Sequence, residues 1–387
     1  MDFSLTEEQS LFQATARRFA ERSLAPGALA RAHAEGFPWD VAGLIAEQGL
    51  MGITLGEADG GQGGSLMDAV LAIEEVARHC PRSADIVQAG NFGAIRTFAE
   101  YASAQQKARW LPRLLAGEMV IALGMSEPEA GSAVTDLKTS ATPDGDGFRI
   151  NGTKVFTTNS PEAQLFLVYV RFGPGVDGIG SVLIERGTPG FSFGRPTRFV
   201  GGDRWQQLYF EDCRVGPENV LLGRGGFKKQ IQGFNVERIG NAARALAVGR
   251  LAFDIARRHA GERIQFGRPL CEFQGIQWKF AEVAMQIEAA QLLLYRAAVS
   301  AEKGLPSAYE TALAKAFCNE AGFRAASEAM QVLGGLGYTE ESLVEYCFRR
   351  TRGWMIAGGS VEIMKNRIAE FVFDRRFAQK PARAAAE

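Results

Sequence analysis

Histidine and cysteine are scarce in this sequence, and their spacing argues against several kinds of chemistry. The three histidines lie far apart, and no serine or cysteine nucleophile motif accompanies them, so a hydrolytic triad has little support. No HExxH, DxDxDG or clustered His/Cys pattern indicates a metal site. The five cysteines include no CxxC pair, which argues against a disulfide framework. We expect them to be buried small hydrophobes in a reducing compartment.

Net charge and long apolar runs are also lacking. The formal net charge is −1 over 387 residues, so nothing draws the whole chain towards nucleic acid or an anionic membrane. No apolar run approaches the roughly 20 residues that a bilayer-spanning helix needs. The segment MDFSLTEEQSLFQ lacks the basic and apolar regions of a secretory signal. We therefore expect a soluble, cytoplasmic protein.

Apolar periodicity predicts a helical first domain over residues 1–121. The chain is long enough for about two or three domains. Ser4 and Glu7 form a candidate capping box for the first helix, and apolar residues then recur near helical spacing. Further helices are predicted over 41–48, 66–78 and 105–116.

The pattern changes to strands in a predicted middle domain, residues 122–232. Phe148–Ile150 and Thr153–Thr158 flank Asn151-Gly152, which predicts a hairpin with an Asn-Gly turn. Glycine and proline separate the strand-like segments that follow. These segments are 166–171, 181–184 and 207–210.

Long helices are predicted in the last domain, residues 233–387. From about Asn235 one apolar stripe runs through Leu246 to Ala256, which indicates a single helix. Long helices with short connections favour an antiparallel bundle. The other helices predicted here are 280–303, 308–333 and 361–373.

Five short segments carry the chemical information. Taken singly, each has a structural explanation such as a turn, a strand or a helix C-cap. In this order, across a helical–β–helical layout, they resemble the acyl-CoA dehydrogenase family from Leu5 to about Phe373. The segments are Met125–Ser132, Lys154–Asn159, Arg263–Gln274, Gln331–Tyr338 and Gly358–Ile363.

The resemblance implies a mainly α fold with a central β domain, namely an N-terminal helical domain, a β-barrel and a C-terminal four-helix bundle. It also implies bound FAD, whose ring needs hydrogen bonds at its polar edge and an apolar surface against its face. Ser126 matches the family residue at the flavin edge, and Phe156 and Thr158 match residues packed against the ring and near its reactive nitrogen. Ser132 matches a residue at the cofactor pyrophosphate.

The resemblance further implies that FAD is shared between copies of the chain, usually in a homotetramer built as a dimer of dimers. Arg263, Phe266 and Gln274 match residues that reach the ADP half of a neighbour's FAD, and an arginine suits a pyrophosphate because its donors pair with two oxygens. The remaining matched cofactor positions are Gln331, Gly335, Ser360 and Glu362.

The catalytic base departs from the commoner family pattern. Many members have a glutamate in the closing motif, where this chain has Gly358. A minority, resembling isovaleryl- and long-chain-type dehydrogenases, carries it in a Glu-Arg pair on the first bundle helix. Glu237-Arg238 precedes Arg263 by 263 − 237 = 26 residues and matches that pattern. The structural alternative for Glu237 is a helix N-terminal carboxylate favoured by the macrodipole.

The acyl pocket is expected on the same helix face. Asn241 and Arg244 follow Glu237 by four and seven residues and return to its side, with Arg238 beside them. If they point inward, the acyl group is short and polar; surface exposure is the alternative. Ala133 replaces the usual aspartate near the cofactor phosphates, and nothing in the sequence explains it.

We therefore predict FAD-dependent α,β-dehydrogenation of an acyl thioester, in which Glu237 removes the α-proton and the β-hydride passes to flavin. The alternatives are a flavin-dependent monooxygenase on the same scaffold and a non-catalytic flavin- and thioester-binding protein. The resemblance implies an electron-transferring flavoprotein as acceptor. Coenzyme A and acyl carrier protein both remain open as the thioester carrier, because both present phosphopantetheine.

Overall fold

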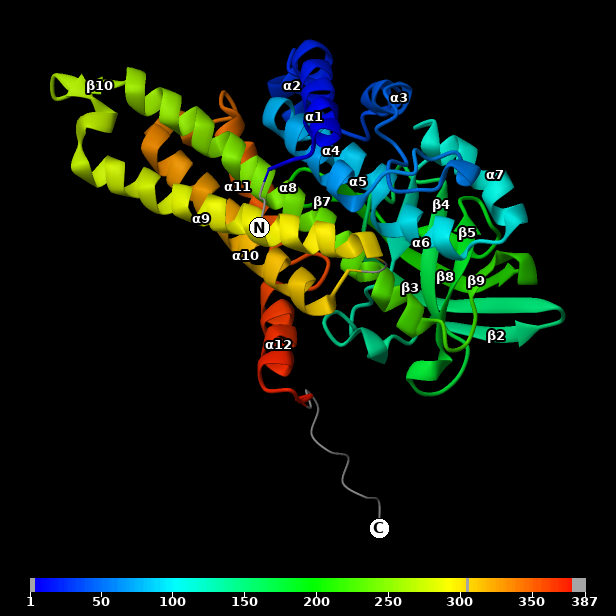
Figure 1. Ribbon diagram of the computed structural model, residues 1–387. Coiled ribbons are helices and arrows are strands. Elements are labelled where there is room, and N and C mark those ends of the chain that lie inside the picture. Colours follow the sequence, from blue (N-terminus) through cyan, green and yellow to red (C-terminus); the bar gives the residue numbers. More distant parts are fainter. Residues whose placement is uncertain (1–3, 304–305, 378–387) are drawn as a thin grey trace.

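The computed structural model describes residues 4–303 and 306–377, which form helices, then a sheet domain, then longer helices in chain order (Figure 1). The first helices include α4, which is buried along most of its length and contacts α1, α5 and, among the later helices, α8. They are α1 (Glu7–Phe19), α2 (Ala28–His33), α3 (Trp39–Glu47), α4 (Leu66–His79), α5 (Ala84–Asn91), α6 (Gly93–Tyr101) and α7 (Ala104–Leu115).

The capping box of α1 is formed by Thr6 and Gln9, so the predicted box of Ser4 and Glu7 is wrong. The Gln9 amide donates to the Thr6 hydroxyl, and the Thr6 amide donates to the Gln9 side chain, each at 3.1 Å. Glu7 is already the first helical residue, and a box needs its acceptor at the third. Leu5 packs against the core from just before the cap, which sets this start.

The middle strands form one sheet with the order β6-β8-β3-β2-β4-β5-β9, with β1 paired to β4 and β7 to β8. The three strand segments predicted after the hairpin lie in β4, β5 and β8. The strands are β1 (Ile121–Gly124), β2 (Ser140–Asp144), β3 (Gly147–Thr158), β4 (Leu165–Arg171), β5 (Ile179–Glu185), β6 (Phe191–Phe193), β7 (Thr197–Arg198), β8 (Arg204–Val215) and β9 (Val220–Leu222).

The Asn-Gly turn predicted at residues 151 and 152 is wrong, because β3 runs straight through both residues. The hairpin turn lies earlier, between the paired residues Asp144 and Gly147. Gly152 instead marks a register shift opposite β8, and a Cβ there would lie 2.6 Å from the Thr139 hydroxyl oxygen. The glycine therefore serves a close approach between chain segments rather than a turn.

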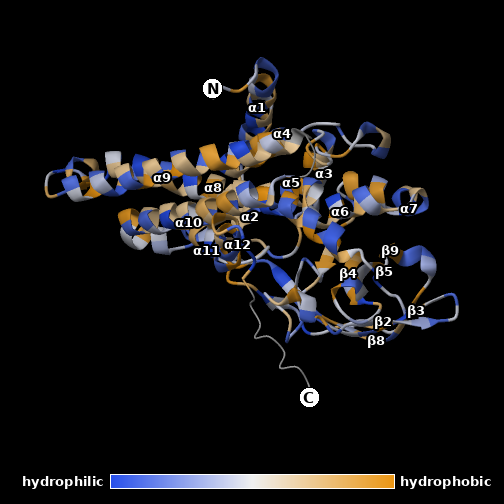
Figure 2. Cartoon of the chain, turned by 60° about the horizontal axis from the view of Figure 1, so that its bottom comes forward, coloured by the Kyte–Doolittle hydropathy of each residue, from blue (hydrophilic) through white to orange (hydrophobic). Residues whose placement is uncertain are grey.

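The C-terminal helices pack side by side, and both polar and apolar residues occur along them (Figure 2). α8 begins eight residues before the predicted start, because Gly226 caps it without a side-chain acceptor and gives no start signal. α11 was missed, and α9 both begins and ends earlier than predicted. The helices are α8 (Phe227–Glu262), α9 (Gln274–Val299), α10 (Ala308–Leu333), α11 (Leu343–Trp354) and α12 (Val361–Val372).

Two further sequence expectations concern single residue types and long helices. Four cysteines are buried as expected, but Cys271 is exposed, because it lies in the connection between β11 (Arg268–Pro269) and α9. Across residues 4–303 and 306–377, no helix is long and apolar enough to cross a membrane. The same residues include no group of three or more His, Cys, Asp or Glu arranged to hold a metal ion.

Glycines bring α8 and α10 into backbone contact. A Cβ on Gly249 would lie 2.5 Å from the Cα of Gly322, and a Cβ on Gly322 would lie 2.2 Å from the carbonyl oxygen of Ala245. Neither distance leaves room for a methyl group. The two helices therefore cross at a separation that only glycine permits.

Gly249→Ala is expected to destabilise the bundle by about 1–3 kcal/mol, because the added methyl overpacks this crossing. Gly261→Ala is the control on the same helix: nothing lies within 4 Å of its Cβ position, so stability should hold or rise by up to ~1 kcal/mol. Thermal unfolding followed by circular dichroism measures both. Equal melting temperatures for the two variants would show that the crossing is not tight.

Candidate active site

Glu237 lies in the third turn of α8 and faces the junction of α5 and α6. It is partly buried, and the Gln88 side chain donates a hydrogen bond to its carboxylate at 2.7 Å. A Cβ at Gly93 would lie 2.8 Å from the same carboxylate oxygen, so the glycine at this junction leaves room for the Glu237 side chain. Burial of the carboxylate is the largest influence on Glu237, and it raises the pKa above the ordinary value.

The macrodipole explanation for Glu237 is wrong. Helix α8 begins at Phe227, ten residues before Glu237. The positive end of a helix acts within about its first turn, so it contributes little here. The carboxylate is therefore held by tertiary contacts rather than by helix capping.

Asn241 and Arg244 point inward, so the surface-exposure alternative is wrong. Asn241 is buried and accepts a hydrogen bond from Asn319 of α10 at 2.9 Å. The Arg244 side chain is 11% exposed and donates to Asp85 of α5 at 2.7 Å, with its guanidinium over the Trp354 ring. The predicted polar face of α8 is real, and both residues already have protein partners.

An ion-pair network ties this face to the sheet domain. Asp85 also accepts from Arg350 of α11, at 2.5 Å. Arg350 in turn pairs with Asp203, in the connection between β7 and β8. Two arginines thus share Asp85, and the network holds α5, α8 and α11 against the sheet domain.

The turn between α11 and α12 contributes carbonyl oxygens to the site. Arg238 donates to the carbonyl of Gly358 at 3.2 Å, and Lys315 of α10 donates to that of Gly359 at 2.8 Å. Both glycines have positive φ angles, 70° and 89°. A Cβ at Gly358 would point towards Lys315 and Asn241, at 3.6 and 3.9 Å. No side chain at Gly358 supplies a base.

Sequence reasoning missed the residues that surround Glu237. Each is a single polar side chain on an otherwise ordinary amphipathic helix, so no local pattern distinguishes it. Only the packing of distant segments brings them together. The missed residues are Asp85, Gln88, Lys315, Asn319 and Arg350.

The predicted flavin-edge residues lie on adjoining segments of the sheet domain. The Val155 amide donates to the Ser126 carbonyl at 2.9 Å, which places Ser126 beside the segment that carries Phe156 and Thr158. Phe156 has a φ of 57°, is 59% exposed and packs on Trp205, with ring centroids 4.8 Å apart. Thr158 is also exposed, and so is Ser132.

These residues fit a flavin ring. Phe156 and Trp205 give an exposed aromatic wall, and Ser126 and Thr158 add hydroxyls near it. The buried Thr157 hydroxyl has no hydrogen-bond partner among the described residues, which leaves one more polar group at the site. An apolar face with a few polar groups is what such a ring requires.

A buried ion pair lies next to the aromatic wall of Phe156 and Trp205. Lys154 is fully buried and donates to the Glu127 carboxylate at 2.7 Å. The backbone amides of Lys138 and Thr139 donate to the same carboxylate, at 2.6 and 2.9 Å. Burial lowers the pKa of Lys154 to about 8. The pair joins the segment of Ser126 to that of Phe156.

The other predicted cofactor residues lie elsewhere in the chain. Arg263, Phe266 and Gln274 are exposed around the hairpin of β10 (Ile264–Gln265) and β11, at the opposite end of the bundle from β3 and β8 (Figure 1). Gln331 and Gly335 are exposed at the end of α10. Ser360 caps α12, with Glu362 exposed in its first turn. One chain does not bring the hairpin residues to Ser126.

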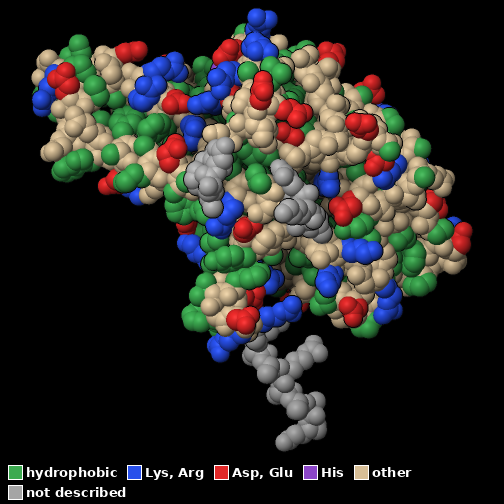
Figure 3. Space-filling view, in the orientation of Figure 1, with side chains coloured by type: hydrophobic (Ala, Val, Ile, Leu, Met, Phe, Trp, Pro, Cys, Tyr) green, Lys and Arg blue, Asp and Glu red, His purple; other side chains and the backbone are tan. Residues whose placement is uncertain are grey.

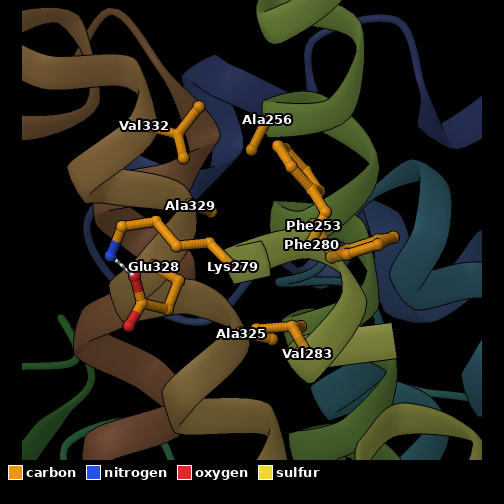
Figure 4. Close-up of a pocket in the computed structure, with 9 residues that line it drawn as sticks. All are labelled: Phe253, Ala256, Lys279, Phe280, Val283, Ala325, Glu328, Ala329 and Val332. Atoms are coloured by element: carbon orange, nitrogen blue, oxygen red, sulfur yellow. Dashed lines mark hydrogen bonds and ion pairs between the residues drawn. The ribbon is translucent and has the colours of Figure 1, made fainter. Parts of the chain in front are cut away.

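Two cavities that the structure describes lie away from Glu237. The first measures about 10 Å³ between α8, α9 and α10, and Figure 4 shows Phe253, Phe280 and Lys279 around it. That volume holds about one water at most, so it is a packing gap. The second, about 170 Å³, lies beside Glu74 and Tyr295. Neither is lined by a predicted site residue.

Comparison with known sequences identifies the family. Sequence models of three acyl-CoA dehydrogenase domains match the chain: the N-terminal domain over residues 6–118, the middle domain over 122–213 and the C-terminal domain over 224–373. The chain therefore belongs to the acyl-CoA dehydrogenase family, and it is an oxidoreductase of that flavin-dependent type, as the sequence predicted.

Individual relatives agree over nearly the whole chain. The 3-sulfinopropanoyl-CoA desulfinase of Paraburkholderia xenovorans is 34% identical over 386 residues, covering 98% of this chain and 99% of its own. The short-chain specific acyl-CoA dehydrogenase of Clostridium acetobutylicum is 34% identical, covering 96% and 100%. The structure of butyryl-CoA dehydrogenase from Megasphaera elsdenii superposes with a TM-score of 0.89 at 33% identity, covering 96% and 100%.

Lys154→Met is expected to destabilise the protein by about 3–5 kcal/mol, because Glu127 is left buried without its cation. FAD content after purification should fall as well, since the pair supports the aromatic wall. Thermal unfolding and the flavin absorbance per chain measure these effects. The double variant Glu127→Gln, Lys154→Met should recover much of the stability. A single variant as stable as wild type would contradict this account of the pair.

Proposed function

We propose that this chain is an FAD-dependent dehydrogenase of a short, polar acyl thioester, with Glu237 as the base that removes the α-proton. The observation that carries the proposal is the setting of Glu237. Its carboxylate has a neutral hydrogen-bond donor in Gln88, its pKa is raised by burial, and the alternative base position is Gly358. A general base works best when its pKa lies near the working pH.

The residues of the protein have separate roles in the reaction. Glu237 accepts the α-proton, and Gln88 orients its carboxylate. FAD, when bound, supplies the two-electron acceptor for the β-hydride. Ser126, Phe156 and Thr158 would hold the flavin ring, as their adjoining positions and the exposure of Phe156 and Thr158 support.

The remaining cofactor contacts support an oligomer. Arg263, Phe266 and Gln274 are exposed around the hairpin of β10 and β11, at the opposite end of the bundle from β3, so a second copy of the chain would bring its hairpin to this copy's FAD. Phe266 is 95% exposed, which suits a residue that contacts a second copy of the chain. Ser132, Gln331, Gly335, Ser360 and Glu362 would complete the FAD site across the copies. The family resemblance implies a homotetramer, and an electron-transferring flavoprotein as the acceptor.

A stripe of exposed apolar residues on α9 also favours association. Trp278, Met285, Leu292 and Val299 recur every seven residues, and each is at least 46% exposed. Residues seven apart fall on one side of a helix, so these form a continuous strip. Figure 3 shows hydrophobic side chains gathered along the bundle on the face it displays. An exposed strip of this kind is typical of an interface.

The acyl pocket is proposed to accept a polar group. Asn241 and Arg244 line the side of α8 that carries Glu237, and Asp85 and Gln88 face them from α5. Arg244 and Asp85 keep a small exposed fraction, and a plain alkyl chain packed against these charges would give them no hydrogen bond. The relative named for 3-sulfinopropanoyl-CoA acts on an acyl group with a polar end, which supports the same class here.

Glu237→Gln is expected to keep FAD but to slow flavin reduction by a thioester about 10²–10⁴-fold, the usual contribution of a general base. Anaerobic flavin bleaching in a stopped-flow instrument measures the rate. In wild type, the rate should fall as the pH drops through the raised pKa of Glu237, because only the ionised form accepts a proton.

Glu74→Gln is the matched control. Glu74 is another partly buried carboxyl, with its pKa raised by burial to about 6, but it binds Tyr295 and Gln291 away from the site. Its variant should bleach at the wild-type rate. Wild-type bleaching by Glu237→Gln would show that another group is the base, and no bleaching by any thioester in wild type would remove the dehydrogenase proposal.

Arg244→Leu is expected to reduce the preference for polar over apolar acyl groups about tenfold or more, since a lost hydrogen-bonding group changes specificity strongly. Arg350 still pairs with Asp85 in this variant, so no buried carboxylate is left alone. Bleaching rates with butyryl and with hydroxyl-, amino- or carboxyl-bearing thioesters, on coenzyme A and on carrier protein, give the ratio. Arg250→Leu, farther along α8, is the control, and an unchanged ratio in Arg244→Leu would refute the polar pocket.

A further inference from the structure

Lys315 is a buried cation to which the reaction above assigns no role. Its side chain is fully buried in α10, and its ammonium group donates to the carbonyls of Gly359 at 2.8 Å and Trp354 at 3.3 Å. Within the described part of the chain no carboxylate lies within 4.0 Å of it. A buried ammonium without a carboxylate partner is costly, so its position calls for a reason.

The helix crossing places Lys315 level with Glu237. Asn241 contacts Asn319, and further along α8 both Ala245 and Gly249 meet Gly322. Residues later in α8 therefore contact residues later in α10, which means that the two helices run in the same direction. Residues four positions apart lie on the same face of a helix. One turn before the Asn241–Asn319 contact, the facing residues are therefore Glu237 on α8 and Lys315 on α10.

Cations outnumber the carboxylates around this pair. Asp85 and Asp203 are already matched by Arg244 and Arg350. Glu237 is therefore surrounded by the charges of Arg244 and Arg238 on its own helix and of Lys315 on α10, with Arg244 acting most strongly. Gln88 of α5 is neutral. On α12, Glu362 and Arg367 carry opposite charges and act on Lys315 and Arg238 respectively.

We propose that Lys315 is a positioning residue whose buried charge keeps Glu237 ionised while its hydrogen bonds clamp the turn between α11 and α12. The inference rests on the proposed role of Glu237 as base. The ammonium holds two carbonyls of the turn, and the same charge favours the carboxylate form of Glu237 across the crossing. One side chain thus couples the shape of the closing turn to the protonation of the base.

The protonation behaviour of the two groups agrees with this coupling. Burial lowers the pKa of Lys315 to about 7, with the nearby Arg238 lowering it further and Glu237 opposing this. Burial raises the pKa of Glu237, and the charges of Arg244, Lys315 and Arg238 oppose that rise. Each charge therefore stabilises the other. Loss of the Lys315 proton above about pH 7 would raise the pKa of Glu237.

The test follows the protonation of Glu237 directly. The carboxylic-acid carbonyl band of the full-length protein is recorded by infrared difference spectroscopy against pH, and its loss in Glu237→Gln assigns it. Lys315→Met removes the charge and the hydrogen bonds, Lys315→Gln keeps a donor without charge, and Lys315→Arg keeps the charge. Lys279→Met, which breaks an ion pair with Glu328 on the outer bundle, is the control.

Both neutral variants are expected to raise the midpoint of the Glu237 titration by about one pH unit or more, as an opposite charge nearby typically shifts a carboxyl. Lys315→Arg and Lys279→Met should stay near wild type. Neutral variants that titrate like wild type would overturn the proposal. A shift in Lys315→Met but not in Lys315→Gln would overturn it as well, because hydrogen bonding rather than charge would then be the cause.

If the neutral variants do not fold, the slope of the titration tests the coupling. Burial lowers the pKa of Lys315 to about 7 and raises that of Glu237, so the two groups titrate over overlapping pH ranges. The Glu237 band should then titrate more shallowly in wild type than in Lys315→Arg, whose charge is not lost. Equal slopes in these two proteins would contradict the coupling. Flavin bleaching is measured in parallel. A shifted band without any thioester-dependent bleaching would refute the dehydrogenase proposal, while the coupling between Lys315 and Glu237 would still be supported.

Discussion

The backbone contact between α8 and α10 is the constraint on which the geometry of the site depends. Gly249 and Gly322 let the helices meet, and this crossing brings Asn241 to Asn319 and Glu237 level with Lys315. Charges buried at such a crossing need compensation. The protein provides it through carboxylates for Arg244 and Arg350 and through carbonyl oxygens of the closing turn for Arg238 and Lys315.

Much of the fold follows from local sequence. Helices α3, α4, α7, α10 and α12 lie close to their predicted bounds, because apolar spacing and end signals are encoded within a few residues. The start of α8 lacks a capping side chain, and the Asn-Gly pair resembles a turn although Thr139 dictates its geometry. The two errors have different causes: the start of α8 carries no local signal, whereas a tertiary contact overrides the Asn-Gly signal.

The site was predictable only in part. The family resemblance picked out Glu237 and Gly358 together, and helical spacing placed Asn241 and Arg244 on the same face. Their inward direction depends on contacts with α5 and α10, far away in the sequence, so spacing alone left it open. Gln88 and Lys315 carry no motif at all, yet both favour the ionised form of Glu237 against the burial that raises its pKa.

The most direct measurement of the central claim isolates proton removal from hydride transfer. A thioester with sulfur in place of its β-carbon cannot lose a β-hydride, but its α-hydrogens can still exchange with deuterated water. Exchange is followed by nuclear magnetic resonance with the FAD-loaded wild type and with Glu237→Gln. The account predicts that wild type catalyses the exchange and the variant does not; exchange by Glu237→Gln at the wild-type rate would contradict it.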